Sequence, residues 1–115
     1  MSESLFPQSE GYVRAINESD AAAFCALFDR DAVVDDAGRE FRGIDAIKDW
    51  SDREIFAARV TLDVLGKSVR DGVDVITTKV DGDFDRTGLP DPLVMDHCIA
   101  IDGGKIVRLT CRLAG

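Results

Sequence analysis

The first 29 residues carry apolar positions at helical spacing, interrupted once by a polar pair. Tyr12 and Ile16 lie four residues apart, which predicts a helix over residues 8–17 with both side chains on its inner face. Asp20 follows at the position of a helix N-cap, and its side chain can accept a bond from the next free backbone N–H groups. A second, Ala-rich helix is therefore expected over residues 21–29.

A short apolar run and a third helical pattern come next. Residues 32–36 predict a β-branched strand that ends in a turn over residues 37–40. From Ile44 the spacing becomes helical again, because Ile44, Ile47 and Trp50 point one way and charged residues point the other. This segment predicts a third amphipathic helix, packed on whatever the rest of the chain builds.

The second half of the chain alternates with a period of two and predicts a sheet. Its strands are expected over residues 59–70, 73–84, 93–101 and 106–113. Gly66 interrupts the first of them as a β-bulge would, and Asp71-Gly72 is a hairpin signal. The order of elements predicts the α+β class, with three N-terminal helices packed on a strongly curved antiparallel sheet.

Composition narrows the class of protein. A chain of 115 residues predicts one domain, residues 1–115, and no apolar run approaches the roughly 20 residues of a membrane helix. The net charge of −8 argues against nucleic acid and anionic membranes as partners. No nucleotide, haem or metal motif is present, so no cofactor is expected. Without a signal-peptide pattern at the amino terminus, and with three unpaired-looking cysteines, we expect a cytoplasmic protein.

Two consecutive carboxylates end the short strand. Side chains alternate along a strand, so only one of Asp35 and Asp36 can face the core. A carboxylate among apolar neighbours is costly in its charged form, a property that suits a general acid or base near neutral pH. The alternative is a solvated pair that opens a turn, and the 22 acidic residues of the chain make this alternative ordinary.

Two further polar residues are expected to face inward. His97, the single histidine, lies on the same strand face as Met95 and Ile99. It is either a core imidazole satisfied by a neighbouring hydroxyl or a functional group. Tyr12, on the inner face of the first helix, either bonds a backbone carbonyl or acts as a neutral donor to a developing oxyanion. Cys98 points to the opposite face and cannot act together with His97.

The order of elements, with the motif "AVVDDAG" at residues 32–38 and Gly43 before the third helix, resembles the nuclear transport factor 2-like superfamily and its SnoaL-like, ketosteroid-isomerase-like branch. The resemblance covers about residues 9–113. It implies a cone-shaped α+β domain of cystatin-like appearance with an apolar pocket. This fold hosts isomerases, cyclases, dehydratases, hydrolases and proteins that only bind, so the resemblance specifies the fold more closely than the function.

The resemblance also suggests catalytic residues. Asp36 matches the carboxylate base of the steroid isomerases, and Tyr12 matches the tyrosine of their oxyanion hole. Where those enzymes hold a protonated aspartic acid, an example of pKa tuning, this chain has His97. We therefore expect Asp36 to move a proton at carbon while Tyr12 and His97 hold the substrate oxygen, as in an isomerase or a polyketide-cyclase-like lyase. The alternative is a ligand-binding or assembly module of the same fold without catalysis.

Ligand and partner expectations follow from the same resemblance. A small apolar ligand is expected against the inward apolar positions of the helices and strands. These positions are Phe28, Trp50, Met95, Ile99, Cys111 and Leu113. A homodimer is expected through the outer sheet face, on which Thr78, Arg108, Thr110 and Arg112 are placed.

Overall fold

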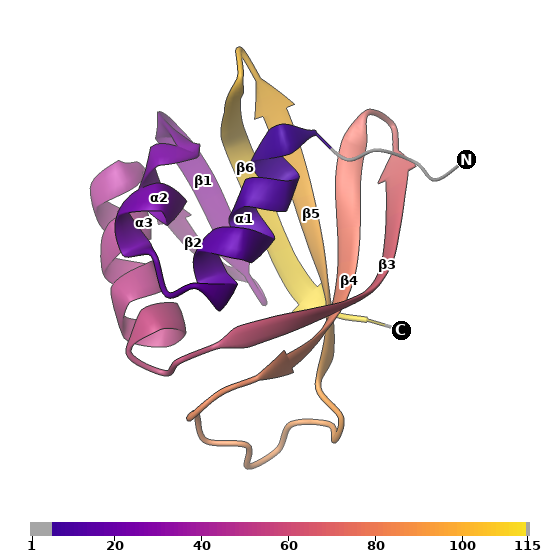
Figure 1. Cartoon of the computed structure of the whole chain (residues 1–115). Helices are drawn as coiled ribbons and strands as arrows, with labels where there is room; N and C mark the ends of the chain where they lie inside the picture. The colour runs from indigo at the N-terminus through magenta and orange to yellow at the C-terminus, as the bar shows by residue number, and fades with distance from the viewer. Residues whose placement is uncertain (1–5, 115) are drawn as a thin grey trace.

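Figure 1 shows a curved, open six-stranded sheet with helices packed on one face, in a computed structural model that describes residues 6–114. The helices are α1 (Pro7–Asn17), α2 (Ala21–Ala26) and α3 (Ile44–Ser51), and a π-helical turn η1 (Asp52–Phe56) continues α3. The strands are β1 (Phe28–Asp36), β2 (Arg39–Arg42), β3 (Thr61–Arg70), β4 (Val73–Asp81), β5 (Val94–Asp102) and β6 (Lys105–Leu113). This architecture confirms the predicted α+β class.

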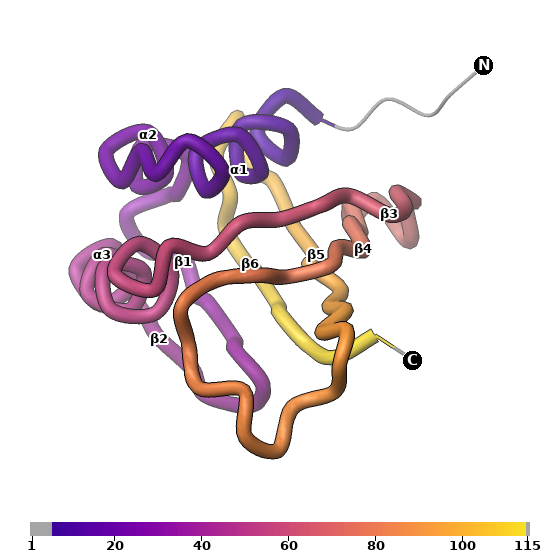
Figure 2. Tube along the Cα trace, turned by 60° about the horizontal axis from the view of Figure 1, so that its bottom comes forward, coloured from indigo at the N-terminus to yellow at the C-terminus, as the bar shows by residue number. Residues whose placement is uncertain are grey.

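The strand order is β2-β1-β6-β5-β4-β3, and the one parallel pair is β1 with β6. All other neighbours are antiparallel. The parallel pair brings the end of β1, early in the sequence, beside the last strand of the chain. The long loop between β4 and β5, drawn in orange, extends away from α1 and α2 (Figure 2). The helices and this loop therefore border the space on the concave side of the sheet.

Several local predictions are confirmed. Asp20 caps α2, because its side chain accepts a bond from the backbone N–H of Ala23 at 3.0 Å. The β3–β4 ladder shifts register between Val64 and Gly66, which is the expected bulge. Asp71 and Gly72 both have positive φ, at 54° and 78°, as a tight hairpin turn requires. These features depend on residues close in sequence, so the sequence pattern was sufficient to predict them.

Two boundaries in the first half were wrong. The second helix ends at Ala26 rather than at residue 29, and β1 begins at Phe28 rather than at residue 32. The start of β6 pairs with the chain at Leu27, because the N–H of Ile106 donates a hydrogen bond to the Leu27 carbonyl at 2.8 Å. Phe24, Leu27 and Phe28 lie at the helical spacing that predicted a longer helix, but Leu27 follows the end of α2 and Phe28 begins β1.

The segment after β1 contains a strand that the sequence pattern did not predict. Ala37 and Gly38 have φ values of 52° and 90° and form a two-residue turn, after which Arg39–Arg42 pairs with β1. The expected turn over residues 37–40 is therefore a hairpin. Its register sets Arg39 directly opposite Asp36.

The predicted outer sheet face needs one correction. Thr78 is fully buried and bonds His97, so it lies on the inner face. Alternation along β4 puts it beside the other inward residues of that strand. Arg108 and Arg112 are exposed and Thr110 is half-buried on β6. The homodimer through this face stays a prediction, with Thr78 removed from it.

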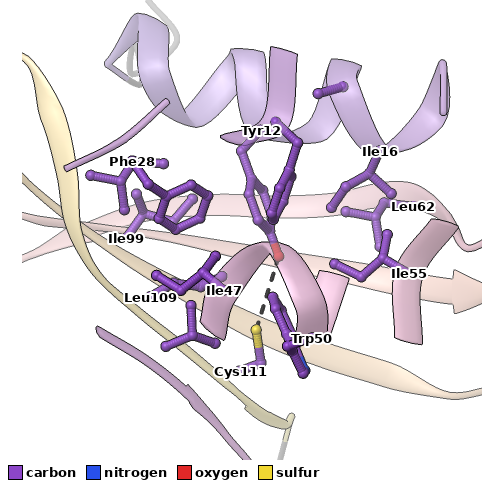
Figure 3. Packing of buried hydrophobic residues seen from close by; sticks show 14 of the residues in the cluster. Tyr12, Ile16, Phe28, Ile47, Trp50, Ile55, Leu62, Ile99, Leu109 and Cys111 are labelled. Atoms are coloured by element: carbon purple, nitrogen blue, oxygen red, sulfur yellow. Dashed lines mark hydrogen bonds between the residues drawn. The ribbon is translucent and has the colours of Figure 1, made fainter. Parts of the chain in front are cut away.

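The core fills the space between the helices and the sheet (Figure 3). Its largest fully buried side chains are aromatic and aliphatic, and they come from both layers: Tyr12, Ile16 and Phe24 from α1 and α2, Ile47 from α3, and Ile76, Ile99, Ile106 and Leu109 from the strands. Phe24 is in contact with Phe28 and Phe56, at ring-centroid distances of 5.0 and 5.6 Å. Within residues 6–114, every helix is too short or too polar to cross a membrane.

Candidate active site

A cavity of about 410 Å³ lies between the concave side of the sheet, the helices and the β4–β5 loop. Most of its wall is apolar, and polar groups enter it at few positions. The apolar residues include Ile16, Trp50, Ile55, Leu62, Val80, Phe84, Leu89, Leu93, Met95 and Leu113. The polar and ionisable residues are Tyr12, Asp36, Glu54, Asp85, His97 and Cys111.

The structure brings the three proposed catalytic residues to this one cavity. Tyr12, Asp36 and His97 all line it, although they come from α1, β1 and β5. Four of the six proposed ligand-binding residues also line it: Trp50, Met95, Cys111 and Leu113.

The other two proposed ligand-binding residues lie elsewhere. Phe28 starts β1, at the opposite end of the strand from Asp36, and packs on Phe24 in the core. Ile99 is fully buried, and its register partner on β6 is Leu109. An inward apolar position can belong either to the solid core or to the cavity wall, and strand alternation does not distinguish the two.

Sheet register explains why Asp36 and His97 approach one another. Asp36 pairs with Cys111 across the parallel β1–β6 ladder, and Cys111 pairs with His97 across β6–β5. These three residues form one row across three adjacent strands, and they share the inner face. The backbones of Asp36 and His97, which are two strand spacings apart, are therefore separated by roughly 10 Å. Tyr12 meets the row from α1, as Figure 3 shows for its hydroxyl and the Cys111 thiol.

Three buried side chains form a hydrogen-bonded chain beside the cavity. The Tyr12 hydroxyl lies 2.8 Å from Nδ1 of His97, and Nε2 of the same ring lies 2.9 Å from the Thr78 hydroxyl. The Cys111 thiol is a distant neighbour, 3.9 Å from the Tyr12 hydroxyl and 3.7 Å from Nδ1. Both ring nitrogens of His97 are thus engaged by protein hydroxyl groups.

This arrangement changes the role expected for His97. A ring whose two nitrogens already have partners has no free N–H to offer a substrate oxygen. His97 lines the cavity, but both of its ring nitrogens are engaged by the hydroxyl groups of Tyr12 and Thr78. Of the two groups expected to hold the oxygen, only Tyr12 has a hydroxyl placed to do so directly.

Burial keeps these groups uncharged near neutral pH. Burial lowers the pKa of His97 from 6.5 to about 4, against a smaller opposing effect of the Asp96 charge. Burial, with smaller contributions from Cys111 and Asp36, raises the pKa of Tyr12 well above its usual value of 10.0. Burial, together with the Asp36 charge, raises the pKa of Cys111 to about 12, so the thiol is not a nucleophilic thiolate. The chain of hydroxyl and imidazole groups is therefore a neutral hydrogen-bonding device.

Asp36 stands at the polar side of the cavity with a defined set of partners. Its Oδ2 accepts a bond from the Trp50 indole N–H at 3.1 Å and from Nη2 of Arg39 at 2.6 Å. Arg39 also donates two bonds to Glu54, at 2.6 and 2.9 Å. No bond within residues 6–114 engages the other oxygen, Oδ1. The carboxylate is thus positioned through one oxygen while the second can accept a proton.

Asp35 contrasts with its neighbour. Its Oδ1 accepts a bond from the backbone N–H of Gly38 at 2.9 Å, which closes the turn, and its Oδ2 is 3.8 Å from Nη2 of Arg108 on the outer side of the sheet. The prediction that only one of the two acids faces inward is confirmed, and Asp36 is that residue.

Three residues of the site escaped the sequence analysis. Arg39 joins it through the hairpin register, and Glu54 joins it from η1. Thr78 joins it as the partner of His97. Alternation along β4 could have placed Thr78 inward, since it lies two residues from the buried Ile76. No local pattern marked Glu54, because the π-helical turn that presents it is not visible in the spacing.

The neutral state of His97 predicts a loss of stability at mildly acidic pH. The unfolded chain takes up a proton below about pH 6.5, whereas the folded chain does not until about pH 4. The contribution of His97 is therefore fully present above pH 6.5 and decreases as the pH falls, by at most about 1.4 kcal/mol per pH unit. The free energy of unfolding, measured with urea, should be about 2 kcal/mol lower at about pH 5 than at about pH 7.

The single histidine makes this measurement clear. In a His97→Gln variant the free energy of unfolding should change much less over the same pH range. A wild-type free energy that stays constant between these two pH values would show that His97 is accessible and protonated in the folded chain.

Comparisons with known proteins agree with this fold. The sequence profile of the SnoaL-like domain matches residues 9–109. A candidate polyketide cyclase from Sinorhizobium meliloti is similar at 28% identity, with a TM-score of 0.83 over 94% of this chain and 95% of that one. A search of the curated proteins found no match.

Two more distant structures share the fold. A protein of ketosteroid-isomerase-like fold from Catenulispora acidiphila has 19% identity and a TM-score of 0.78, over 96% of this chain and 88% of that one. A Mycobacterium tuberculosis protein in complex with estradiol-17β-hemisuccinate has 15% identity and a TM-score of 0.77, over 93% and 91%. The chain therefore belongs to the SnoaL-like domain family, whose fold is nuclear transport factor 2-like, and its relatives carry isomerase-like and cyclase-like names.

Proposed function

We propose that this protein binds a small apolar carbonyl compound and moves a proton at a carbon next to the carbonyl group, as an isomerase or cyclase does. The observation that carries the proposal is the pairing of two groups on one apolar cavity. The Asp36 carboxylate and the Tyr12 hydroxyl both line it, on opposite layers of the fold. A base and a neutral donor on one cavity are the two components that enolisation requires.

In the proposed reaction, Oδ1 of Asp36 removes a proton from carbon. The electron pair of the broken C–H bond moves toward the carbonyl, and negative charge develops on its oxygen. The Tyr12 hydroxyl donates a hydrogen bond to that oxygen and remains protonated, because its pKa is raised. Return of the proton to another carbon gives isomerisation. Attack of the enolate carbon on a second carbonyl of the same molecule gives cyclisation, and the proton held by Asp36 then passes to the new alkoxide oxygen.

The apolar wall contributes by excluding water. Side chains such as Leu62, Leu93 and Met95 surround the space between the base and the donor. In such a medium a hydrogen bond to a developing charge is worth more than in water, because no solvent competes for it. The fold neighbour from M. tuberculosis is in complex with estradiol-17β-hemisuccinate, whose fused rings support a cyclic ligand for this chain.

The proposal is tested by deuterium exchange. The protein is incubated in D₂O with cyclic ketones, cyclic enones and 1,3-diketones, and incorporation at the carbon next to the carbonyl is followed by NMR. We expect exchange with at least one of these classes to exceed the buffer rate by about 100-fold or more. Binding of these compounds, seen as shifts in the protein spectrum, without any added exchange would contradict the catalytic proposal.

A second candidate is a binding module without catalysis. The observation in its favour is that Asp36 already has structural partners, since it joins Arg39 and Trp50 at the edge of the cavity. In this case the Asp36 carboxylate holds the β1–β2 hairpin against α3. Tyr12 and His97 are then only hydrogen-bond partners of one another in the core. The exchange experiment distinguishes the two candidates, because this module would bind ketones and exchange nothing.

A further inference from the structure

We infer that Thr78 and His97 orient the Tyr12 hydroxyl, so that the Tyr12 proton points into the cavity and the site selects a ligand with a hydrogen-bond acceptor. Thr78 would act through His97 as a positioning residue, because it does not line the cavity. The consequence for the ligand rests on the proposed function, whereas the orientation itself is a property of the protein alone.

Thr78, His97 and Tyr12 together carry more protons than the contacts between them can hold. Thr78 and Tyr12 each carry one hydroxyl proton, and a neutral imidazole carries one N–H. Only two contacts join these three groups, at 2.9 Å between Thr78 and Nε2 and at 2.8 Å between Nδ1 and Tyr12. Each contact holds one proton. The third proton must therefore point away from the other two groups at one end of this hydrogen-bonded series, either at Thr78 or at Tyr12.

Surroundings at the two ends differ. The Thr78 side chain is fully buried, and its hydroxyl has no partner other than His97 within residues 6–114. If Thr78 only accepted a bond from Nε2–H, its own proton would be buried without an acceptor, which is costly. Tyr12 lines the cavity, where a ligand oxygen can lie, and its hydroxyl also has the Cys111 thiol at 3.9 Å as a weak acceptor.

The favoured arrangement therefore runs in one direction. The Thr78 hydroxyl donates to Nε2, the Nδ1–H group donates to the Tyr12 oxygen, and the Tyr12 hydroxyl donates into the cavity. The low pKa of His97, about 4, agrees with a ring that carries only one proton. Each donated bond polarises the next group in the chain, so Nδ1–H strengthens Tyr12 as a donor when charge develops on a ligand oxygen.

A preference among ligands follows from this direction. A carbonyl oxygen can only accept, so it pairs with the outward Tyr12 proton. In the opposite arrangement the Tyr12 proton would be held by Nδ1, and the cavity would meet only lone pairs of the phenol oxygen. Such a cavity would favour a ligand that donates. The orientation set by Thr78 thus favours a ketone over the corresponding alcohol.

The test is the tautomer of His97, read from the ¹⁵N resonances of the ring at about pH 7 in protein without a purification tag. Because the chain has one histidine, a single ring contributes. We expect the Nδ1–H form to exceed the Nε2–H form by at least about fivefold, from the cost of leaving a buried donor unpaired. A predominant Nε2–H form in the wild-type protein would overturn the inference.

Two variants test the role of Thr78 separately. Thr78→Val keeps the shape and removes the hydroxyl, so neither an Nε2–H group nor a bare Nε2 finds a partner there, and the excess of the Nδ1–H form, at least about fivefold in the wild type, should fall to about parity. Thr78→Ser keeps the hydroxyl and should retain the wild-type tautomer. An unchanged tautomer in Thr78→Val would refute the positioning role.

Neither tautomer measurement needs a substrate or turnover, so the orientation of the Tyr12 hydroxyl can be tested independently of the proposed function. An Nδ1–H ring in a protein that exchanges no carbon acid would leave the orientation correct and the catalytic proposal wrong. An Nε2–H ring in a protein that does catalyse exchange would leave the catalytic proposal standing and the orientation wrong.

Discussion

Replacing Asp36 with Asn is expected to reduce carbon-acid exchange by at least about 100-fold, because the amide has no basic oxygen to accept the proton. The substitution is close to isosteric. Its amide oxygen can still accept the Trp50 indole N–H, while the ion pair with Arg39 is lost. Arg39 is half-exposed, with a relative side-chain exposure of 54%, so this loss should cost less than about 1 kcal/mol of unfolding free energy.

Asp35→Asn is the matched control for this variant. Asp35 precedes Asp36 on the same strand and faces the other side of the sheet, where it bonds Gly38. The control removes one negative charge from the same strand end and should leave the exchange rate within about twofold of the wild type, since the cavity is not altered. An Asp36→Asn protein that keeps more than a tenth of wild-type exchange would exclude Asp36 as the base.

The second large effect is expected for Tyr12→Phe. Removal of one donor to a developing oxyanion typically costs about 100-fold to 1,000-fold in rate. The same substitution leaves Nδ1 of His97 without its partner at 2.8 Å and should lower the free energy of unfolding by about 1 to 3 kcal/mol. Activity and stability are both affected, so they must be measured separately, by exchange kinetics on the folded protein and by urea unfolding.

The division between kcat and KM identifies the role of Tyr12. A donor that strengthens its bond only as charge develops should lower kcat much more than it raises KM. If the whole loss in kcat/KM came from a higher KM, with kcat unaltered, Tyr12 would only bind the ligand. An exchange rate equal to that of the wild type would remove Tyr12 from the reaction and leave it as a buried partner of His97.

Much of the fold could be predicted because its signals are local. The inward position of Tyr12 follows from the helical period, and the strand period requires that only one of Asp35 and Asp36 faces inward. Gly66 and Asp71-Gly72 predict the bulge and the hairpin turn that the structure shows. Each of these features is decided by residues a few positions apart. Long-range contacts can adjust such features but seldom reverse them.

The boundaries near β1 were mispredicted for the opposite reason. Leu27 and Phe28 continue the helical spacing of Phe24, yet the Leu27 carbonyl accepts a bond from the N–H of Ile106, almost 80 positions later in the chain. The hairpin strand Arg39–Arg42 is short and carries a polar pattern, so only its pairing with β1 defines it as a strand. In both places a distant strand supplied the hydrogen bonds that fixed the local conformation.

The sequence by itself determined that Tyr12, His97 and one of the two neighbouring carboxylates face inward, and therefore that a phenol, an imidazole and a carboxylate are available. Tertiary structure decided how they are connected. The register of β1, β6 and β5 aligned Asp36, Cys111 and His97 in one row, and the pairing of β4 with β5 put Thr78 behind the imidazole. A strand's period fixes the face on which a side chain lies, but only pairing with a distant strand fixes its neighbours.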